Sequence, residues 1–171
     1  MISRWIKLPF LNIILIFTIF LLGCDNIAKN QDEAELYMMV SEVNKEVPIK
    51  VAPGQTINYL EYDSKSKKLN ITYGFTDGWE YGREYSYDNY FKLTYSKAEK
   101  VFKKRIIKDL LSKRSHELLG LLLKNNVALV YKMYYYKTRK QINIEFSPDE
   151  LREIYRKYYP EQYSKEFESN V

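Results

Sequence analysis

The chain has 171 residues, of which 46% are hydrophobic and 29% charged, so it can bury a core and is not globally disordered. Its net charge of +5 is spread along the chain, which excludes a charged tail and indicates a solvated basic surface. Tyr is frequent, with 17 residues, but so are Lys, Asn and Ile. A compositional bias can therefore explain part of the Tyr content, and that content alone is no evidence of function.

The N-terminus has the three parts of an export signal. Residues 1–7 carry two positive charges and no acid, and residues 8–22 are almost wholly apolar. Gly23 and Cys24 close the apolar run, and Asp25 begins a polar sequence. A positive start, a short apolar middle and a small residue at the cut are typical of a secretory signal.

The run Leu21-Leu22-Gly23-Cys24 resembles the lipobox of bacterial lipoproteins. The resemblance implies that the chain is cut between Gly23 and Cys24, that the Cys24 thiol receives a diacylglyceryl group, and that the new amino terminus is acylated. Two or three acyl chains hold a protein firmly on a bilayer. The expected location is the extracytoplasmic side of the cell membrane, which is the periplasmic side in a two-membrane cell, where Asp25 resembles an inner-membrane retention signal.

This interpretation divides the chain into a removed signal (1–23), a lipidated tether (24–31) and one globular domain (32–171). Cys24 is the single cysteine, so the domain has no intramolecular disulfide and depends on packing. Two alternatives remain open at this point: an uncleaved transmembrane anchor, and an ordinary secretory signal with an incidental Cys.

Apolar spacing along the domain predicts three helical regions and two hairpins. Helices are expected over 32–44, 96–111 and 148–159, with a short additional helix before Asn125-Asn126. Strand alternation predicts one hairpin from 57–62 and 69–75 and another from 127–136 and 141–146. The predicted fold is α+β, in the order helix, hairpin, helix, hairpin, helix, with the helices packed on one antiparallel sheet.

Ser147 and Glu150 form a capping box around Pro148, which predicts the start of the last helix, and Pro160 is expected to end it. The domain also resembles small, mostly uncharacterised exported bacterial lipoproteins. The likeness lies in the Asn44–Pro48 segment and in a Tyr-rich strand that follows a Leu-rich helix end, over 118–136. This resemblance implies a fold of the same kind and supplies no activity.

The residues give little sign of catalysis. His116 is the single histidine, no nucleophile elbow is present, and one His without a free Cys predicts neither a metal site nor a cofactor. The lipid on Cys24 is the one covalent group expected. The alternative function is a small envelope hydrolase using paired carboxylates, and the candidates for these are Glu61, Asp77, Glu80, Glu84 and Asp88.

A lysine- and tyrosine-rich stretch at 130–141 superficially resembles a nucleic-acid-binding surface. An exported, lipid-anchored chain rarely meets nucleic acid, and alternating Tyr and Lys is ordinary in a strand. We therefore expect no nucleic-acid partner. The hairpin tip at 137–140 is instead a candidate for contact with anionic lipid headgroups.

The favoured functional segment is 76–91, which is rich in Gly and aromatic residues. Tyr and Trp are enriched at protein interfaces, so this segment predicts a partner-binding surface made of Trp79, Tyr81, Tyr85, Tyr87 and Tyr90. The structural alternative is a further strand whose Tyr side chains cover the sheet. The predicted function is therefore a membrane-anchored envelope lipoprotein, not an enzyme, whose domain binds a protein in an accessory, piloting, immunity or exclusion role.

Overall fold

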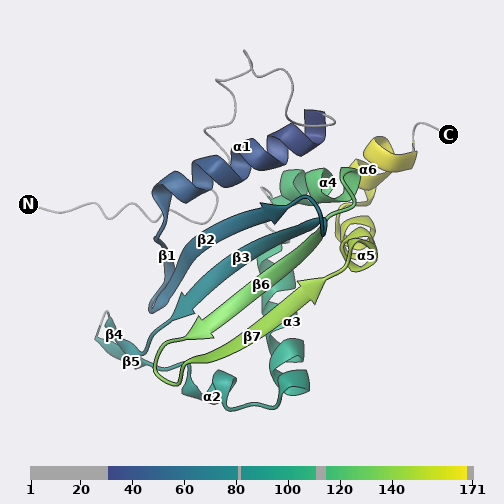
Figure 1. The fold of residues 1–171 in the computed structure, drawn as a ribbon. Helices are drawn as coiled ribbons and strands as arrows, with labels where there is room; N and C mark the ends of the chain where they lie inside the picture. The colour runs from purple at the N-terminus through teal and green to yellow at the C-terminus, as the bar shows by residue number, and fades with distance from the viewer. Residues whose placement is uncertain (1–30, 81, 111–114, 169–171) are drawn as a thin grey trace, which may run out of the picture.

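A computed structural model describes residues 31–80, 82–110 and 115–168 of the chain (Figure 1). Its centre is a five-stranded sheet with the order β1-β2-β3-β6-β7. The strands are β1 (Ile49–Ala52), β2 (Gln55–Asp63), β3 (Lys68–Phe75), β6 (Ala128–Tyr135) and β7 (Lys140–Phe146). A separate small hairpin follows β3 in the chain and is made of β4 (Gly78–Glu80) and β5 (Arg83–Tyr85).

Four longer helices lie behind the sheet and at its margins, together with several shorter ones. Figure 1 shows α1 along the edge beside β2, α3 and α4 behind the sheet, and α5 at one end. The longer helices are α1 (Gln31–Glu46), α3 (Tyr95–Leu110), α4 (Ser115–Lys124) and α5 (Pro148–Tyr158), and the shorter ones are α2 (Asp88–Phe91), α6 (Pro160–Tyr163) and the π-helix η2 (Ser164–Glu168).

The predicted arrangement of helices on one antiparallel sheet is wrong, although the α+β class is right. The two inner strands, β3 and β6, pair in parallel, with Leu69 beside Leu129 and Tyr73 beside Met133. The sheet is therefore mixed. The β1 strand, the β4–β5 hairpin and the helices α2 and α6 also break the simple alternation of helix and hairpin.

The parallel pairing follows from the long connection between the two hairpins. Antiparallel strands can be joined by a tight turn, but parallel neighbours need a crossover of a dozen or more residues. Residues 76–127 form such a crossover, which includes the small hairpin and α2 to α4 and lets β6 start beside the start of β3. Each hairpin is antiparallel within itself, so the predicted hairpins are confirmed and their mutual orientation is not.

Alternation along the strands separates a covered face from an open face. Leu69 and Ile71 of β3 and Ile142 and Ile144 of β7 are buried under the helices. Their neighbours in sequence are more exposed, and Figure 1 shows no helix over the front of the sheet. This is the pattern of a sheet with one face on the core and one face in water.

The helix α1 closes the edge of the sheet where β1 ends. The side chain of Asn44 donates to the Leu60 carbonyl oxygen at 2.7 Å and accepts from the Leu60 amide at 2.9 Å. An unpaired strand edge invites pairing with other chains, so a side-chain amide that satisfies both groups protects it. Beside Asn44, α1 buries Leu36, Met39 and Val43 in the core, as the apolar spacing predicts.

The predicted helix ends are confirmed at two places. Ser147 accepts a hydrogen bond from the Glu150 amide, and the Glu150 carboxylate accepts one from the Ser147 amide, which is a complete capping box for α5. Asn126 follows α4 with a φ of 53°, the left-handed conformation that Asn tolerates better than most residues. Pro160 ends α5, as expected, but it also begins α6.

Candidate functional site

The aromatic segment 76–91 contains both buried and exposed rings. Tyr87 is buried and packs edge-on against Phe75, with 5.0 Å between the ring centroids. Its hydroxyl donates to the Pro53 carbonyl oxygen at 2.5 Å and accepts from the Gln55 side chain at 2.7 Å. Tyr85 and Tyr90 are half-buried and pack against the same core, whereas Tyr81 lies outside the described residues.

Trp79 differs from these tyrosines because 70% of its surface is exposed. It lies in the middle of β4, opposite Glu84 of β5, on the hairpin that projects beyond the end of the main sheet (Figure 1). The structure therefore places one ring of the predicted surface in solvent and holds Tyr85, Tyr87 and Tyr90 on the core beneath it.

Asp77 fixes the position of this segment. Its carboxylate accepts hydrogen bonds from the Tyr135 hydroxyl at 2.6 Å, the Lys137 ammonium at 2.8 Å and the Tyr87 amide at 2.8 Å. These donors come from the end of β6, the turn after it and the entry to α2. One side chain therefore joins three segments at the base of the Trp79 hairpin.

The ionised form of Asp77 is strongly favoured. Burial alone would raise the pKa of this carboxyl, but the hydrogen bonds from Lys137, Tyr135 and the Tyr87 amide outweigh burial and hold the pKa well below its usual range. For the same reason the Asp77 carboxylate raises the pKa of Lys137. Asp77 is thus a fixed anion within a structural network and a poor proton donor at neutral pH.

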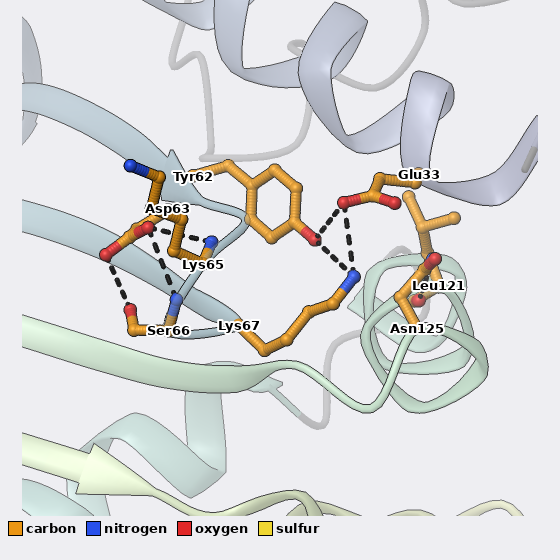
Figure 2. A network of polar contacts seen from close by, with 8 residues as sticks. All are labelled: Glu33, Tyr62, Asp63, Lys65, Ser66, Lys67, Leu121 and Asn125. Atoms are coloured by element: carbon orange, nitrogen blue, oxygen red, sulfur yellow. Dashed lines mark hydrogen bonds and ion pairs between the residues drawn. The ribbon is translucent and has the colours of Figure 1, made fainter. Parts of the chain in front are cut away.

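A second cluster of the same chemistry docks α1 at the other end of the sheet (Figure 2). Glu33 is buried and accepts from the Tyr62 hydroxyl at 2.9 Å and from the Lys67 ammonium at 3.1 Å. Burial and the bond to Glu33 raise the pKa of Tyr62. Burial would lower the pKa of Lys67, but the bonds to Glu33 and Tyr62 outweigh it and the pKa is raised.

Figure 2 also shows the β2–β3 turn beside this cluster, where Asp63 accepts from the Lys65 amide at 3.0 Å and from the Ser66 hydroxyl at 2.7 Å. Asn125, at the end of α4, is buried nearby and donates to the Leu121 carbonyl oxygen at 2.9 Å. These bonds fix a turn and a helix end, so their role is structural.

The other candidate carboxylates lie apart from Asp77 in function. Three of these carboxylates form ion pairs with lysines: Glu61 with Lys132 at 4.0 Å, Glu80 with Lys50 at 2.7 Å and Asp88 with Lys92 at 2.5 Å. The fourth, Glu84, is exposed on β5. In the described part of the chain, no group of three or more His, Cys, Asp or Glu side chains is placed to hold a metal ion.

His116 lies in the first turn of α4, with its ring 6.0 Å from that of Tyr159.

A groove of about 700 Å³ runs between α3 and α5. Lys103 on its wall donates to Glu150 at 2.7 Å and lies 3.4 Å from Glu99, so two carboxylates balance its positive charge. The other charged residues of the groove are mostly lysines of α3, and the exposed ring of Tyr158 closes the α5 side. The groove is lined by Ser96, Glu99, Lys100, Lys103, Lys104, Ile107, Lys108 and Tyr158.

The open face of the sheet carries polar side chains and three tyrosines. Tyr59 and Tyr136 are about half exposed, at 51% and 49%. The Tyr136 hydroxyl accepts from the Asn58 side chain at 2.9 Å, and its ring packs edge-on against Tyr134 at 5.0 Å. A Cβ on Gly74 would lie 2.7 Å from the Tyr136 ring, so a larger residue there would have to displace that ring.

Sequence reasoning treated Asp77 as one of five possible catalytic acids and missed its structural role. Its side-chain partners follow 58 and 60 residues later, and no local pattern announces such a contact. The lysines of α3 recur at helical spacing in the sequence. The buried residues of the helix, known from the structure, show that these lysines share its solvent-facing side. Gly23 and Cys24 lie outside the described residues.

Comparison with protein families finds no family model that matches the chain, and comparison with curated protein sequences finds no match. Among solved structures, the chain is similar to a "putative secreted protein" from Pseudomonas aeruginosa, known from a crystal structure at 1.60 Å resolution. The sequence identity is 15%, the TM-score is 0.46, and the match covers 72% of this chain and 99% of the other. A likeness of this degree carries no argument about function.

None of the helices in the described ranges combines the length and the apolar character that a membrane crossing requires.

Proposed function

We propose that the protein is a lipoprotein, anchored through Cys24 on the extracytoplasmic side of the cell membrane, and that its domain binds an envelope protein through the Trp79 hairpin. The anchor is supported by the lipobox-like run Leu21–Cys24 after an apolar signal. The binding role is supported by the exposure of Trp79 on a firmly held hairpin.

The exposed Trp79 ring is the observation that carries the binding role. A Trp side chain that is 70% exposed leaves a large apolar area in water, and such rings are the residues on which interface affinity most often depends. A rigid base reduces the entropy lost on binding. Asp77 and Tyr87 supply that base through hydrogen bonds to the end of β6 and to the β1–β2 turn.

The piloting, accessory, immunity and exclusion roles all remain within this proposal, because each requires a membrane-tethered domain with one protein partner. A carboxylate hydrolase has less support. Among the described residues that line the α3 groove, Glu99 is the single acid, and the Lys103 ammonium lies 3.4 Å from its carboxylate. Paired-acid hydrolysis needs two carboxylates across one substrate.

The test places a photoactivatable phenylalanine analogue at position 79 of the full chain in cells, and in a second strain at position 65. Lys65 lies in the β2–β3 turn at the opposite end of the sheet from β4, and it is exposed, so it is a matched control. We expect one discrete crosslinked product from position 79 and none of the same size from position 65.

Competition makes the result specific. Excess purified chain with Trp79 intact should suppress the crosslink, and excess W79A chain should not. Equal crosslinking from both positions, or equal suppression by both competitors, would contradict the proposed binding surface while leaving the lipid anchor unaffected.

A further inference from the structure

The outer face of α3 carries a row of four lysines. Lys97, Lys100, Lys104 and Lys108 recur at intervals of three and four residues, which places them on one side of the helix. All four are exposed. The buried residues of the same helix, including Phe102 and Ile106, lie on the opposite side and pack into the core. The row spans about 16 Å along the helix axis.

These four charges are not neutralised within the described part of the molecule. Lys103, which points to the neighbouring side, is paired with Glu99 and Glu150, but no ion pair is found between the four lysines and a described carboxylate. Like charges at this spacing repel each other and destabilise a helix slightly. A row of exposed cations without a described ion-pair partner is available to an anionic surface outside the molecule.

We propose that the lysine row of α3 contacts the anionic lipid headgroups of the membrane to which the protein is anchored. The inference uses the proposed function in one respect, the lipid at Cys24. From Cys24 to Gln31, where α1 begins, the chain can reach at most about 25 Å. Such a tether keeps the domain at a high effective concentration beside the bilayer, so weak headgroup contacts are enough to orient it.

The position of the row favours a lipid surface over an acidic peptide. The four lysines lie on the side of α3 directly away from the core, where a flat surface can meet all of them at once. Three of the four, Lys100, Lys104 and Lys108, also line the groove between α3 and α5, whose wall includes the exposed Tyr158 ring. Tyr is favoured at membrane interfaces because its ring is apolar and its hydroxyl is polar. The first turn of α1 also lies near α4, the helix that follows α3 (Figure 1).

The size of the effect can be stated in advance. A lysine near an anionic membrane surface contributes about a fivefold change in binding, and the attraction is screened within about 8 Å at physiological salt. An orientation held by three or four lysines should therefore be strong at low salt and weak in 0.5 M NaCl.

The experiment measures lysine accessibility in the processed full chain, purified from membranes and reconstituted into vesicles. One set contains phosphatidylcholine alone, and the other contains 30% phosphatidylglycerol. A brief pulse of an amine-acetylating reagent is followed by peptide mass spectrometry. In the phosphatidylglycerol vesicles we expect at least fivefold slower labelling of Lys100, Lys104 and Lys108, reversed by 0.5 M NaCl, with no change at Lys65.

A triple variant, K100Q/K104Q/K108Q, should lose the difference between the two vesicles at Lys97. A matched variant with the same loss of charge elsewhere, K45Q/K65Q/K132Q, should retain it. Those three control lysines lie at the end of α1, in the β2–β3 turn and on the open face of the sheet. A general loss of positive charge would affect both variants equally and would overturn the proposal.

Flotation of the same samples separates this proposal from the anchor. A chain that floats with phosphatidylcholine vesicles is anchored, and equal labelling in both vesicles then overturns the lysine contact alone. A chain that floats only with phosphatidylglycerol vesicles lacks the anchor but supports the lysine contact. Flotation with neither overturns both. Protection in native membranes but not in phosphatidylglycerol vesicles overturns the lipid contact and indicates an acidic protein.

Discussion

The two ends of the sheet are held by the same combination of side chains, a carboxylate that accepts from a tyrosine and a lysine. At one end Glu33 binds Tyr62 and Lys67. At the other end Asp77 binds Tyr135 and Lys137, and it also accepts from the Tyr87 amide. Glu33 joins one helix to one hairpin, whereas Asp77, in the crossover, joins the entry to α2 to the end of β6 and the turn after it.

The difference lies in what each cluster supports. The Glu33 cluster docks α1, which also buries Leu36 and Met39 and therefore has apolar packing to hold it. The Asp77 cluster supports the short strands β4 and β5, which have little core of their own. We therefore expect the hairpin end to depend on its polar network more than the α1 end does.

The largest expected effect is at Gly54, in the β1–β2 turn. Its φ is +63°, and a Cβ there would overlap the Thr76 carbonyl oxygen and the Tyr85 ring. G54A should lower the free energy of unfolding by about 3 kcal/mol or more. Gly82 is a matched control, because its φ is +73° but a Cβ would meet nothing within 4 Å. G82A should cost about 1 kcal/mol, measured for both by urea unfolding.

Removal of the Asp77 carboxylate should have the next largest effect. D77A leaves the fully buried Tyr135 hydroxyl and the Tyr87 amide without their acceptor, so we expect a loss of about 3 kcal/mol in the free energy of unfolding. Urea unfolding followed by circular dichroism gives the value. A loss below about 1 kcal/mol would show that the hairpin end is held by packing instead.

The corresponding change at the α1 end should be milder. E33A removes the acceptor of Tyr62 and Lys67, but Lys67 is partly exposed and can be hydrated, and α1 retains its apolar contacts. We expect a loss of about 1.5 kcal/mol under the same conditions. If E33A destabilised the protein more than D77A does, the proposed contrast between the two ends would be reversed.

Acid should remove the advantage that Asp77 provides. The folded-state pKa of Asp77 lies below the unfolded value of about 3.9, so its contribution is fully present above that value and is lost as the pH falls below it towards the folded pKa. The difference in unfolding free energy between wild type and D77N should therefore shrink as the pH falls from about 4.5 to about 3. A difference that is constant or grows on acidification would contradict the network described for Asp77.

The smallest effect on stability is expected at Trp79. Its exposed ring makes little contact with the core, so W79A should change the free energy of unfolding by less than about 0.5 kcal/mol. In residues 24–171 it is the single Trp, so its fluorescence reports on this hairpin directly. Emission typical of water-exposed Trp, shifted to the blue on partner binding, is the expected result; a blue emission in the free protein would show that the ring is covered.

Local patterns predicted much of the fold. The apolar stripe Leu36, Met39 and Val43 placed α1, the alternation in β3 and β7 placed both hairpins, and Ser147 with Glu150 placed the start of α5. These features depend on neighbours within a few residues. The β1 strand was missed because it has four residues and is followed directly by Pro53-Gly54, a pair typical of a turn.

The parallel pairing of β3 with β6 could not be predicted in the same way. Each hairpin satisfies its own alternation whichever neighbour it has, so the choice depends on how the 76–127 crossover packs. The same distance hid the partners of Asp77. For the aromatic segment, composition identified the place, but it could not separate Tyr87, which is buried through its contacts with Pro53 and Phe75, from the exposed Trp79.

The lipid anchor is the central claim, and radiolabelled palmitate tests it most directly. Cells expressing the wild-type chain or C24A are labelled and then fractionated into membrane and soluble parts. We predict that the wild type takes up label, is processed to the size of residues 24–171 and stays in the membrane fraction, and that C24A takes up none and remains unprocessed. A wild-type chain without label would contradict the account, and residues 1–23 would then be an ordinary signal or an anchor.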